Sequence, residues 1–268
     1  MNYFERSVCE LPGAPEGARG TLHAYCNTYT GAIAPLPAVV ICPGGAYAET
    51  SEDEGEPVAL SLLASGFQAF VLHYSTAPAR FPTALFELFA TLRYLHDHHE
   101  ELLIDPSRIV VMGFSAGAHL AGCAGILHDC PELAAQFGDL LPRLKPAAMC
   151  LSYPVISSGS YGHAESIENL TGEKGGALTD RLSLERAVSG STVPAFVWHT
   201  ANDAVVPVQN SLLLAEAFAR EGVPFELHIY PDGRHGLSLA NGLSQHQNPP
   251  VSGWFADAVR FLKSQLGL

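Results

Sequence analysis

One stretch near the middle of the chain limits the fold more than any other. Residues 108–112 are apolar after Arg108 and mostly β-branched, which is typical of a short buried strand. The mostly small residues 118–124 are typical of a closely packed helix. Between them stand Gly113-Phe114-Ser115-Ala116-Gly117, a G-x-S-x-G pattern. A serine at such a strand-to-helix turn is strained, and its hydroxyl is exposed above the sheet edge. The pattern therefore predicts an α/β fold with Ser115 as a nucleophile.

Two explanations of this pattern compete. Gly and Ser are common, so five residues of this kind recur by chance, whereas here a strand precedes them and a helix follows. Gly113 and Gly117 would also allow the turn to close without steric conflict. The context favours a catalytic serine over a chance match.

Segments typical of strands and of helices alternate after about residue 36. Residues 38–42 form a continuous β-branched run that ends at Pro43, as expected for a strand buried on both faces. This alternation predicts a mostly parallel, doubly wound sheet with helices on both faces. The other predicted strands are residues 68–72, 108–112, 147–152, 193–199 and 225–230, and the predicted helices are residues 56–65, a long helix from Pro82, residues 208–220 and an amphipathic C-terminal helix.

Two regions depart from this alternation. The chain through about residue 36 has the pattern of strands and loops, so we expect an antiparallel edge there. Residues 153–192 are rich in Gly and Ser and lack a strong apolar stripe, and a loop of this length is usually functional or disordered. We expect one domain over residues 1–268, with residues 155–192 as a small cap or loop insertion over the C-terminal edge of the sheet.

Charge argues against two classes of partner. The formal net charge is −13, and Lys and Arg form no cluster, so the charge disfavours nucleic acid and an anionic membrane as partners. No apolar stretch is long enough to span a bilayer, and the N-terminus lacks the basic and apolar regions of a secretory signal. We expect a cytoplasmic protein that acts on a small molecule. Whether it forms a homo-oligomer is left open.

Neither cysteine nor histidine indicates a metal site. The six cysteines are scattered without C-x-x-C or metal-ligand spacing, which favours reduced thiols in a cytoplasmic protein. His96, His98 and His99 with Asp97 resemble a metal cluster, but they lie at the predicted C-terminus of a helix, where such residues are ordinary. We prefer the interpretation that they are solvated, and we expect no metal and no organic cofactor.

A serine nucleophile needs a base and an acid that orients it. With a nucleophile on this kind of turn, the acid and then the base follow on loops after later strands. Asp203 follows the predicted strand 193–199, and His235 follows the predicted strand 225–230. Because parallel strands end at one sheet edge, Ser115, Asp203 and His235 are predicted to converge there as a catalytic triad.

Other residues compete for these roles. His119 lies one helical turn beyond Ser115, which favours a packing or hydrogen-bonding role beneath it. His228 alternates within a strand and is not expected to reach the edge. Asp232 is a rival acid, but Pro-Asp-Gly is itself a turn signal, so we favour Asp203.

The reaction also needs hydrogen-bond donors for a developing oxyanion. One is expected to be the Ala116 N–H, and the other the N–H of Gly45 or Ala46, in the Gly-rich loop after the predicted strand 38–42. Substrate-pocket residues are harder to place from sequence. We expect the substrate pocket to be lined by Gly44, Tyr47, Phe114, Tyr153 and His199. For His199, a structural or supporting role is favoured over catalysis.

Several blocks accompany the serine motif in a fixed order. Before it come Pro43-Gly44-Gly45-Ala46-Tyr47 and Glu54-Gly55-Glu56-Pro57, and after it Tyr153-Pro154-Val155-Ile156, Trp198-His199-Thr200, Asp203 with Val206-Pro207-Val208, and Gly233-Arg234-His235-Gly236. Together they resemble the bacterial acetylxylan-esterase-like branch of short-chain esterases and lipases in the α/β-hydrolase superfamily. The resemblance covers nearly the whole chain from about residue 37.

The resemblance implies an α/β-hydrolase fold and a serine carboxylesterase. Its substrates would be small esters of short acyl groups, above all acetyl, such as acetylated sugars or xylo-oligosaccharides. A peptidase or amidase is the alternative, since the same triad cleaves amides. A non-catalytic binding protein of the same fold is disfavoured because each triad position has a candidate.

Overall fold

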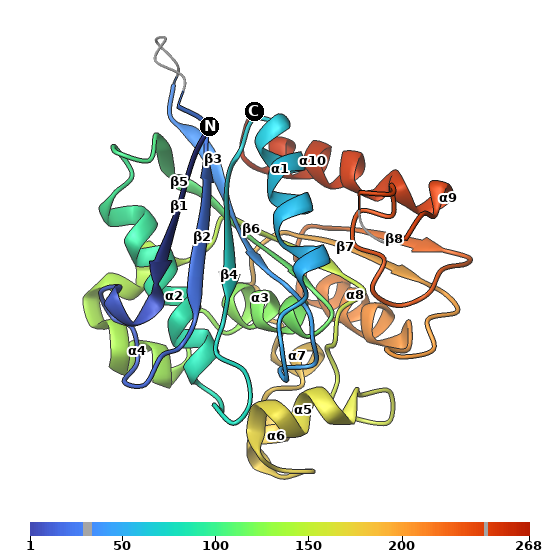
Figure 1. Cartoon of the computed structure of the whole chain (residues 1–268). Helices are drawn as coiled ribbons and strands as arrows, with labels where there is room; N and C mark the ends of the chain where they lie inside the picture. The colour runs from blue at the N-terminus through green and yellow to red at the C-terminus, as the bar shows by residue number, and fades with distance from the viewer. Residues whose placement is uncertain (29–33, 244–245) are drawn as a thin grey trace.

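A single sheet runs through the computed structural model, which describes residues 1–28, 34–243 and 246–268. Its described strands lie in the order β1-β2-β4-β3-β5-β6-β7-β8 (Figure 1). Strands β3 to β8 pair in parallel, whereas β1 and β2 pair antiparallel, and β2 joins β4 antiparallel. The predicted parallel sheet and its antiparallel edge are confirmed. The strands are β1 Asn2–Ser7, β2 Thr21–Cys26, β3 Leu36–Cys42, β4 Gln68–His73, β5 Ile104–Phe114, β6 Ala148–Ser152, β7 Ala195–Thr200 and β8 Phe225–Tyr230.

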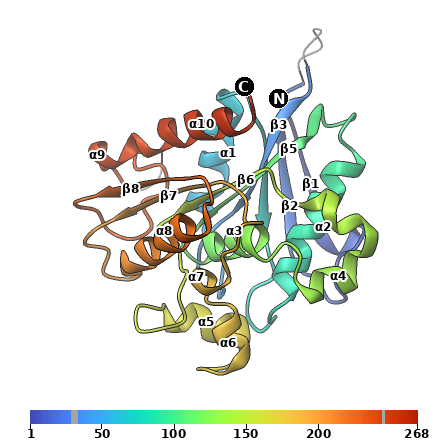
Figure 2. The same cartoon turned by 180° about the vertical axis from the view of Figure 1, so that it is seen from behind.

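Helices cover both faces of the sheet (Figures 1 and 2). On one face, apolar side chains of α2, α3 and α8 join one buried cluster, and on the other, those of α1 and α10 join a second. The two layers enclose the central strands, as predicted from the alternation of elements. The longer helices are α1 Glu56–Ala64, α2 Thr83–Asp97, α3 Ala116–Ile126, α8 Gln209–Glu221 and α10 Trp254–Gln265, with the shorter α4 Pro131–Phe137 and α9 Pro249–Ser252.

The central strands explain why their sequence is apolar at every position. Successive side chains of a strand point to opposite faces. In β3, Val40 belongs to the α2, α3 and α8 side, and its neighbours Val39 and Ile41 belong to the α1 and α10 side. All three are fully buried. A strand with helices on both faces therefore needs a continuous apolar run, and this run fixes where the strand ends and the functional loops begin.

Residues 155–192 contain more regular structure than their composition indicated. They form α5 Ala164–Thr171, α6 Ala177–Arg181 and α7 Leu184–Ala187, with α5 and α6 lying beyond one end of the sheet (Figures 1 and 2). The periodic signal is weak because α5 buries only Ile167 and Leu170 as apolar residues. This segment docks closely: a Cβ on Gly122 of α3 would lie 2.7 Å from Leu184.

The described residues give no membrane-spanning helix of sufficient length and apolar character. All six cysteines are free thiols. Burial raises the pKa of the Cys26 thiol to about 12. The buried thiols behave as small apolar side chains.

Candidate active site

The turn between β5 and α3 holds Ser115 in a strained conformation. Its φ is +52° and its ψ is −117°, outside the regions that most side chains adopt. The turn closes tightly because both flanking glycines touch backbone. A Cβ on Gly113 would lie 2.2 Å from the Gly117 carbonyl oxygen, and one on Gly117 would lie 2.0 Å from that of Cys42. Both glycines are therefore required for Ser115 to project from the sheet.

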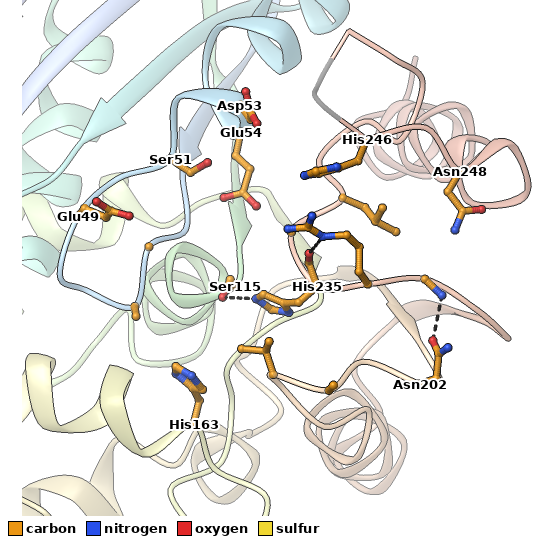
Figure 3. A pocket seen from close by; sticks show the side chains of 18 of the residues that line it. Glu49, Ser51, Asp53, Glu54, Ser115, His163, Asn202, His235, His246 and Asn248 are labelled. Carbon is orange, nitrogen blue, oxygen red and sulfur yellow. Dashed lines mark hydrogen bonds between the residues drawn. The ribbon is translucent and has the colours of Figure 1, made fainter.

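Ser115, His235 and Asp203 form one hydrogen-bonded chain. The Ser115 Oγ lies 2.8 Å from His235 Nε2 (Figure 3). On the other side of the ring, His235 Nδ1 lies 2.6 Å from Asp203 Oδ2. When Nδ1–H donates to the carboxylate, Nε2 is left to accept the Ser115 O–H. Asp203 follows β7 and His235 follows β8. The structure therefore brings the three residues together at the carboxyl edge of the sheet.

Asp203 lies in an environment that favours its charged form. Burial raises its pKa, but hydrogen bonds from His199 and His235 and from the backbone outweigh burial, so that the pKa lies below its ordinary value. Its Oδ1 accepts the N–H groups of Val205 and Val206 at 2.9 and 3.0 Å. The carboxylate is therefore fixed in place while its Oδ2 faces His235.

The loop after β3 turns two peptide N–H groups away from its own interior. The Gly44 carbonyl accepts the Ser51 N–H at 2.9 Å, and the Gly45 carbonyl accepts the N–H groups of Ala48 and Glu49. In a trans peptide the N–H points opposite to the carbonyl, so the N–H groups of Gly45 and Ala46 face outward. Both residues line the pocket that contains Ser115.

These amides and the Ala116 N–H make no hydrogen bond within the described residues. Ala116 is the first residue of α3, directly after Ser115, so its N–H is one of the unpaired donors of a helix N-terminus. Gly45 has φ +126°, and a Cβ there would lie 2.3 Å from the Glu49 carbonyl oxygen. Gly45 and Ala46 therefore bring unpaired N–H groups to the pocket wall, and Ala116 brings one directly beside Ser115.

An open pocket of about 1160 Å³ surrounds Ser115 and His235. Polar side chains from separate segments reach it: Glu49 from the loop after β3, His163 from the start of α5, Asn202 from the loop after β7, and Asn248 (Figure 3). The remaining lining residues are Gly45, Ala46, Ala48, Ser51, Asp53, Glu54, Glu165, Ala204, Val205, Asp232, Gly233, Arg234, Gly236, Leu237, His246 and Gln247.

The five residues expected to border the pocket lie behind its wall instead. Tyr47 is buried, and its hydroxyl pairs with His119 Nδ1 at 3.0 Å. Phe114 is fully buried against the rings of Tyr153 and Trp254. The five are Gly44, Tyr47, Phe114, Tyr153 and His199, and none of them lines the pocket.

Three of these residues support the site from behind. Gly44 packs against the nucleophile, since a Cβ there would lie 3.0 Å from Ser115 Cβ. The ring of Tyr153 packs edge-on against that of His235, with centroids 5.0 Å apart. His199 is fully buried, with Nδ1 2.8 Å from Ser211 Oγ and Nε2 3.3 Å from Asp203 Oδ2. Sequence position at a strand end did not reveal which way these side chains turn.

The rival histidines and acid have other partners. His119 is buried beneath the turn, where burial lowers its pKa to about 4 and its Nε2 lies 2.9 Å from the Leu182 carbonyl oxygen. His228 pairs with Glu226 on β8. The Asp232 carboxylate accepts a hydrogen bond from Asn202. Among the described residues, no group of three or more His, Cys, Asp or Glu side chains is arranged to hold a metal ion.

Several lining residues received no role from sequence, among them Glu54 and His163. Glu54 is 4% exposed and lies within an acidic run that is typical of a solvated turn, so no sequence signal marks it as buried. Burial raises its pKa, opposed by hydrogen bonds from Tyr153 and the Gly44 N–H. His163 lies at the N-cap of α5, in the Gly- and Ser-rich segment whose helices were not predicted.

Comparison with known proteins identifies the family. The BD-FAE family model matches residues 25–218, which include Ser115 and Asp203. The chain belongs to the BD-FAE family. This BD-FAE protein is 36% identical to the acetyl ester-xyloside bifunctional hydrolase of Caldicellulosiruptor lactoaceticus, with a TM-score of 0.86 over 98% of this chain and 96% of that one. It is 29% identical to the carboxylesterase Cest-2923 of Lactobacillus plantarum, with a TM-score of 0.85 over 100% and 99% of the two chains. The α/β-hydrolase fold is thereby confirmed.

Curated relatives of this BD-FAE chain are longer. It is 35% identical over 212 residues to endo-1,4-beta-xylanase B of Butyrivibrio fibrisolvens, covering 76% of this chain and 33% of that protein. It is 28% identical over 246 residues to an acetylxylan esterase of Xylanibacter ruminicola, covering 89% of this chain and 45% of that protein. The chain thus spans less than half the length of either relative.

Proposed function

We propose that this protein is a serine carboxylesterase that hydrolyses short-chain acyl esters, with acetyl esters as its main substrates. The observation that carries the proposal is the unbroken chain from Ser115 through His235 to Asp203, with distances of 2.8 and 2.6 Å. Similarity to a carboxylesterase and to an acetyl ester-xyloside hydrolase supports it. In the proposed reaction, the triad and the oxyanion donors need no metal and no organic cofactor.

In the first half-reaction, Ser115 Oγ attacks the ester carbonyl carbon while His235 Nε2 takes its proton. Asp203 keeps the imidazole in the tautomer that accepts this proton and stabilises the resulting imidazolium. The carbonyl oxygen becomes an oxyanion, which the N–H groups of Ala116 and of Gly45 or Ala46 stabilise. His235 then returns the proton to the leaving alcohol, and the acyl group stays on Ser115.

In the second half-reaction, water replaces the alcohol. His235 takes a proton from the water, which attacks the acyl carbon and forms a second oxyanion at the same donors. Collapse of this intermediate releases the carboxylic acid and returns the proton to Ser115. The pocket is open to solvent beside His235, which gives water access to the acyl enzyme.

The alcohol side of the ester is proposed to be a sugar or a xylo-oligosaccharide. A pocket with amide, imidazole and carboxylate groups on several walls suits a leaving group with many hydroxyls. Relatives named acetylxylan esterase and acetyl ester-xyloside hydrolase support this choice. The free thiols support a reducing compartment, so we propose that the enzyme acts in the cytoplasm.

Hydrolysis of 4-nitrophenyl acetate tests the proposal directly. The wild-type protein is expected to turn over, and Ser115→Ala to lose about 10⁴-fold or more in kcat while it keeps its unfolding temperature. Wild-type turnover by Ser115→Ala would sink the proposal. Aminoacyl anilides serve as the competing substrates, and faster cleavage of these amides than of acetyl esters would make the protein a peptidase or amidase instead.

A further inference from the structure

Glu54 is a buried acid that forms no ion pair with a Lys or Arg among the described residues. It ends the short helix η2 Glu52–Glu54, and it is 4% exposed. A buried carboxylate is costly unless hydrogen bonds satisfy its oxygens. Here each oxygen accepts a different donor: Oε2 accepts the Gly44 N–H at 2.7 Å, and Oε1 accepts the Tyr153 O–H at 2.5 Å. The mechanism above does not use this group.

One oxygen of Glu54 holds the loop that carries the proposed oxyanion donors. Gly44 is bound at both ends, since its N–H donates to Glu54 and its carbonyl accepts the Ser51 N–H. The next two peptide N–H groups along this loop belong to Gly45 and Ala46. Their direction depends on the Gly44 peptide, which packs closely on Ser115, since a Cβ on Gly44 would lie 3.0 Å from Ser115 Cβ. A shift of Gly44 would therefore move the donors relative to the nucleophile.

The other oxygen holds the loop that carries His235. The Tyr153 hydroxyl donates to Glu54 and accepts the Ser238 N–H at 3.0 Å, while its ring packs edge-on against His235. A second bond runs in parallel, because the Ser238 hydroxyl donates to the Asp53 carbonyl at 2.6 Å. Figure 3 shows the Glu54 carboxylate pointing toward the Ser115 and His235 pair.

We propose that Glu54 is a positioning residue that sets the oxyanion donors and His235 relative to each other across the active site. The role needs a carboxylate, since both donors require an acceptor, and a glutamine would present its NH₂ group to one of them. The inference rests on the proposed function, because it concerns the geometry of that reaction. Misplacement of reacting groups by about 1 Å costs roughly 10²-fold in rate.

The test compares Glu54→Gln, Tyr153→Phe and the double variant in hydrolysis of 4-nitrophenyl acetate. Glu52→Gln is the matched control, since Glu52 is an exposed acid on the same turn. We expect Glu54→Gln to lower kcat by about 10²-fold and to leave KM within about threefold, because both Glu54 oxygens bind protein groups, the Gly44 N–H and the Tyr153 O–H. Tyr153→Phe is expected to lower kcat by about tenfold.

The double variant shows whether Glu54 and Tyr153 act together or whether their substitutions cause two independent losses of activity. Residues that act through one network show non-additive effects, so the double variant is expected to be no slower than Glu54→Gln. Labelling by a fluorophosphonate counts the folded, reactive Ser115 in each sample, and kcat is normalised to it. Wild-type kcat in Glu54→Gln, or a double variant that shows the product of the two single effects, would overturn the proposal.

Two outcomes remain to be distinguished. If Glu54→Gln does not fold, Tyr153→Phe decides alone, because it keeps the ring and removes only the hydroxyl that Glu54 binds; a wild-type kcat there overturns the inference. If the wild-type protein itself fails to hydrolyse 4-nitrophenyl acetate, the proposed function fails, whereas a normal wild type with an unaffected Glu54→Gln defeats only the role of Glu54.

Discussion

The floor of the pocket and its rim are built in different ways. The floor, which comprises Ser115, Asp203, His235 and the groups that hold them, extends from the ends of parallel strands, and Ser115 and Asp203 are 9% and 8% exposed. The rim, which comprises the lining side chains from Glu49 and His163 round to Asn202 and Asn248, comes from loops and the first turn of α5. The sheet thus positions the proposed triad, while the side chains proposed to meet the alcohol lie on segments that can change independently.

The floor is held by many partners for each group. Asp203 receives two backbone N–H groups besides His235, and Ser115 is strained into place by close backbone contacts. On the rim, His163 has one hydrogen bond of its side chain within the described residues, to Ser166. Substitutions in the floor are therefore expected to cost far more than substitutions in the rim, and four experiments test this difference.

The largest effect is expected for Asp203→Asn. The amide would present an N–H to His235 Nδ1, so the imidazole would carry its proton on Nε2 and lose the ability to accept the Ser115 proton. We expect kcat for 4-nitrophenyl acetate to fall about 10⁴-fold, equivalent to roughly 5 kcal/mol. Asn202→Asp, a rim change one residue earlier, is the control, and an equal loss there would contradict the division into floor and rim.

Gly117→Ala is expected to have the next largest effect, on stability. The new Cβ would lie 2.0 Å from the Cys42 carbonyl oxygen, so β3 and α3 must move apart. We expect a loss of about 4 kcal/mol in the free energy of unfolding, measured by urea denaturation. Gly175→Ala in the segment 155–192 is the matched control, because nothing lies within 4 Å of its Cβ position. Equal stability of both variants would show that the turn tolerates a wider opening.

The residues of the floor could be predicted from the sequence because they are marked by neighbouring residues or by the end of a strand. The glycines around Ser115 report a close backbone contact, and the positions of Asp203 and His235 follow from where two apolar runs end. Most bounds of the predicted strands followed from the same runs, although β5 begins at Ile104 and not at the predicted residue 108. An acid such as Glu54 carries no such signal, since its burial depends on Tyr153, 99 residues further along the chain, and on how the loop after β3 folds back to Gly44.

The pocket wall was predicted poorly for a related reason. Tyr47, Phe114 and Tyr153 stand beside motif residues, but their large rings are buried and fill space behind the turn. Proximity in sequence does not fix the direction of a side chain. The rim residues instead come from segments with little apolar periodicity, such as the first turn of α5.

A third prediction concerns His119 beneath the turn. Burial lowers the pKa of His119 to about 4, well below its ordinary value, so between about pH 6.5 and 4 the unfolded chain binds a proton there that the folded chain does not. The neutral His119 side chain therefore stabilises the folded protein above about pH 6.5, and this stabilisation is lost as the pH falls toward 4. Relative to His119→Gln, the wild-type protein is expected to lose roughly 3 kcal/mol of unfolding free energy between pH 7.5 and 4.

Urea denaturation of both proteins at several pH values measures this difference. In the difference between the wild-type protein and His119→Gln, the contributions of all other titrating groups to the unfolding free energy cancel, since both proteins contain them. His163→Gln is the rim control: His163 is half-buried, and a smaller change is expected because water reaches its ring. Parallel curves for wild type and His119→Gln would show that His119 is not held neutral.

The smallest effect is expected on the rim, for His163→Ala. The Ser166 hydroxyl is fully buried, and its one hydrogen bond among the described residues is to His163 Nδ1, at 2.8 Å. Since a buried hydroxyl needs an acceptor for its proton, Nδ1 accepts it, and Nε2–H is left as a donor at the pocket. For an acetylated xyloside we expect KM to rise about fivefold in His163→Ala, equivalent to about 1 kcal/mol for one lost hydrogen bond.

The choice of substrate makes this last experiment decisive. 4-Nitrophenyl acetate has no sugar hydroxyl to accept the Nε2–H, so its kcat and KM are expected to change less than about twofold in His163→Ala. A loss of similar size on both substrates would place His163 with the floor, because only a group that serves the acyl transfer itself affects every ester alike. A selective loss on the xyloside would instead locate recognition of the alcohol in residues 155–192, where the chain departs furthest from the regular alternation of strand and helix.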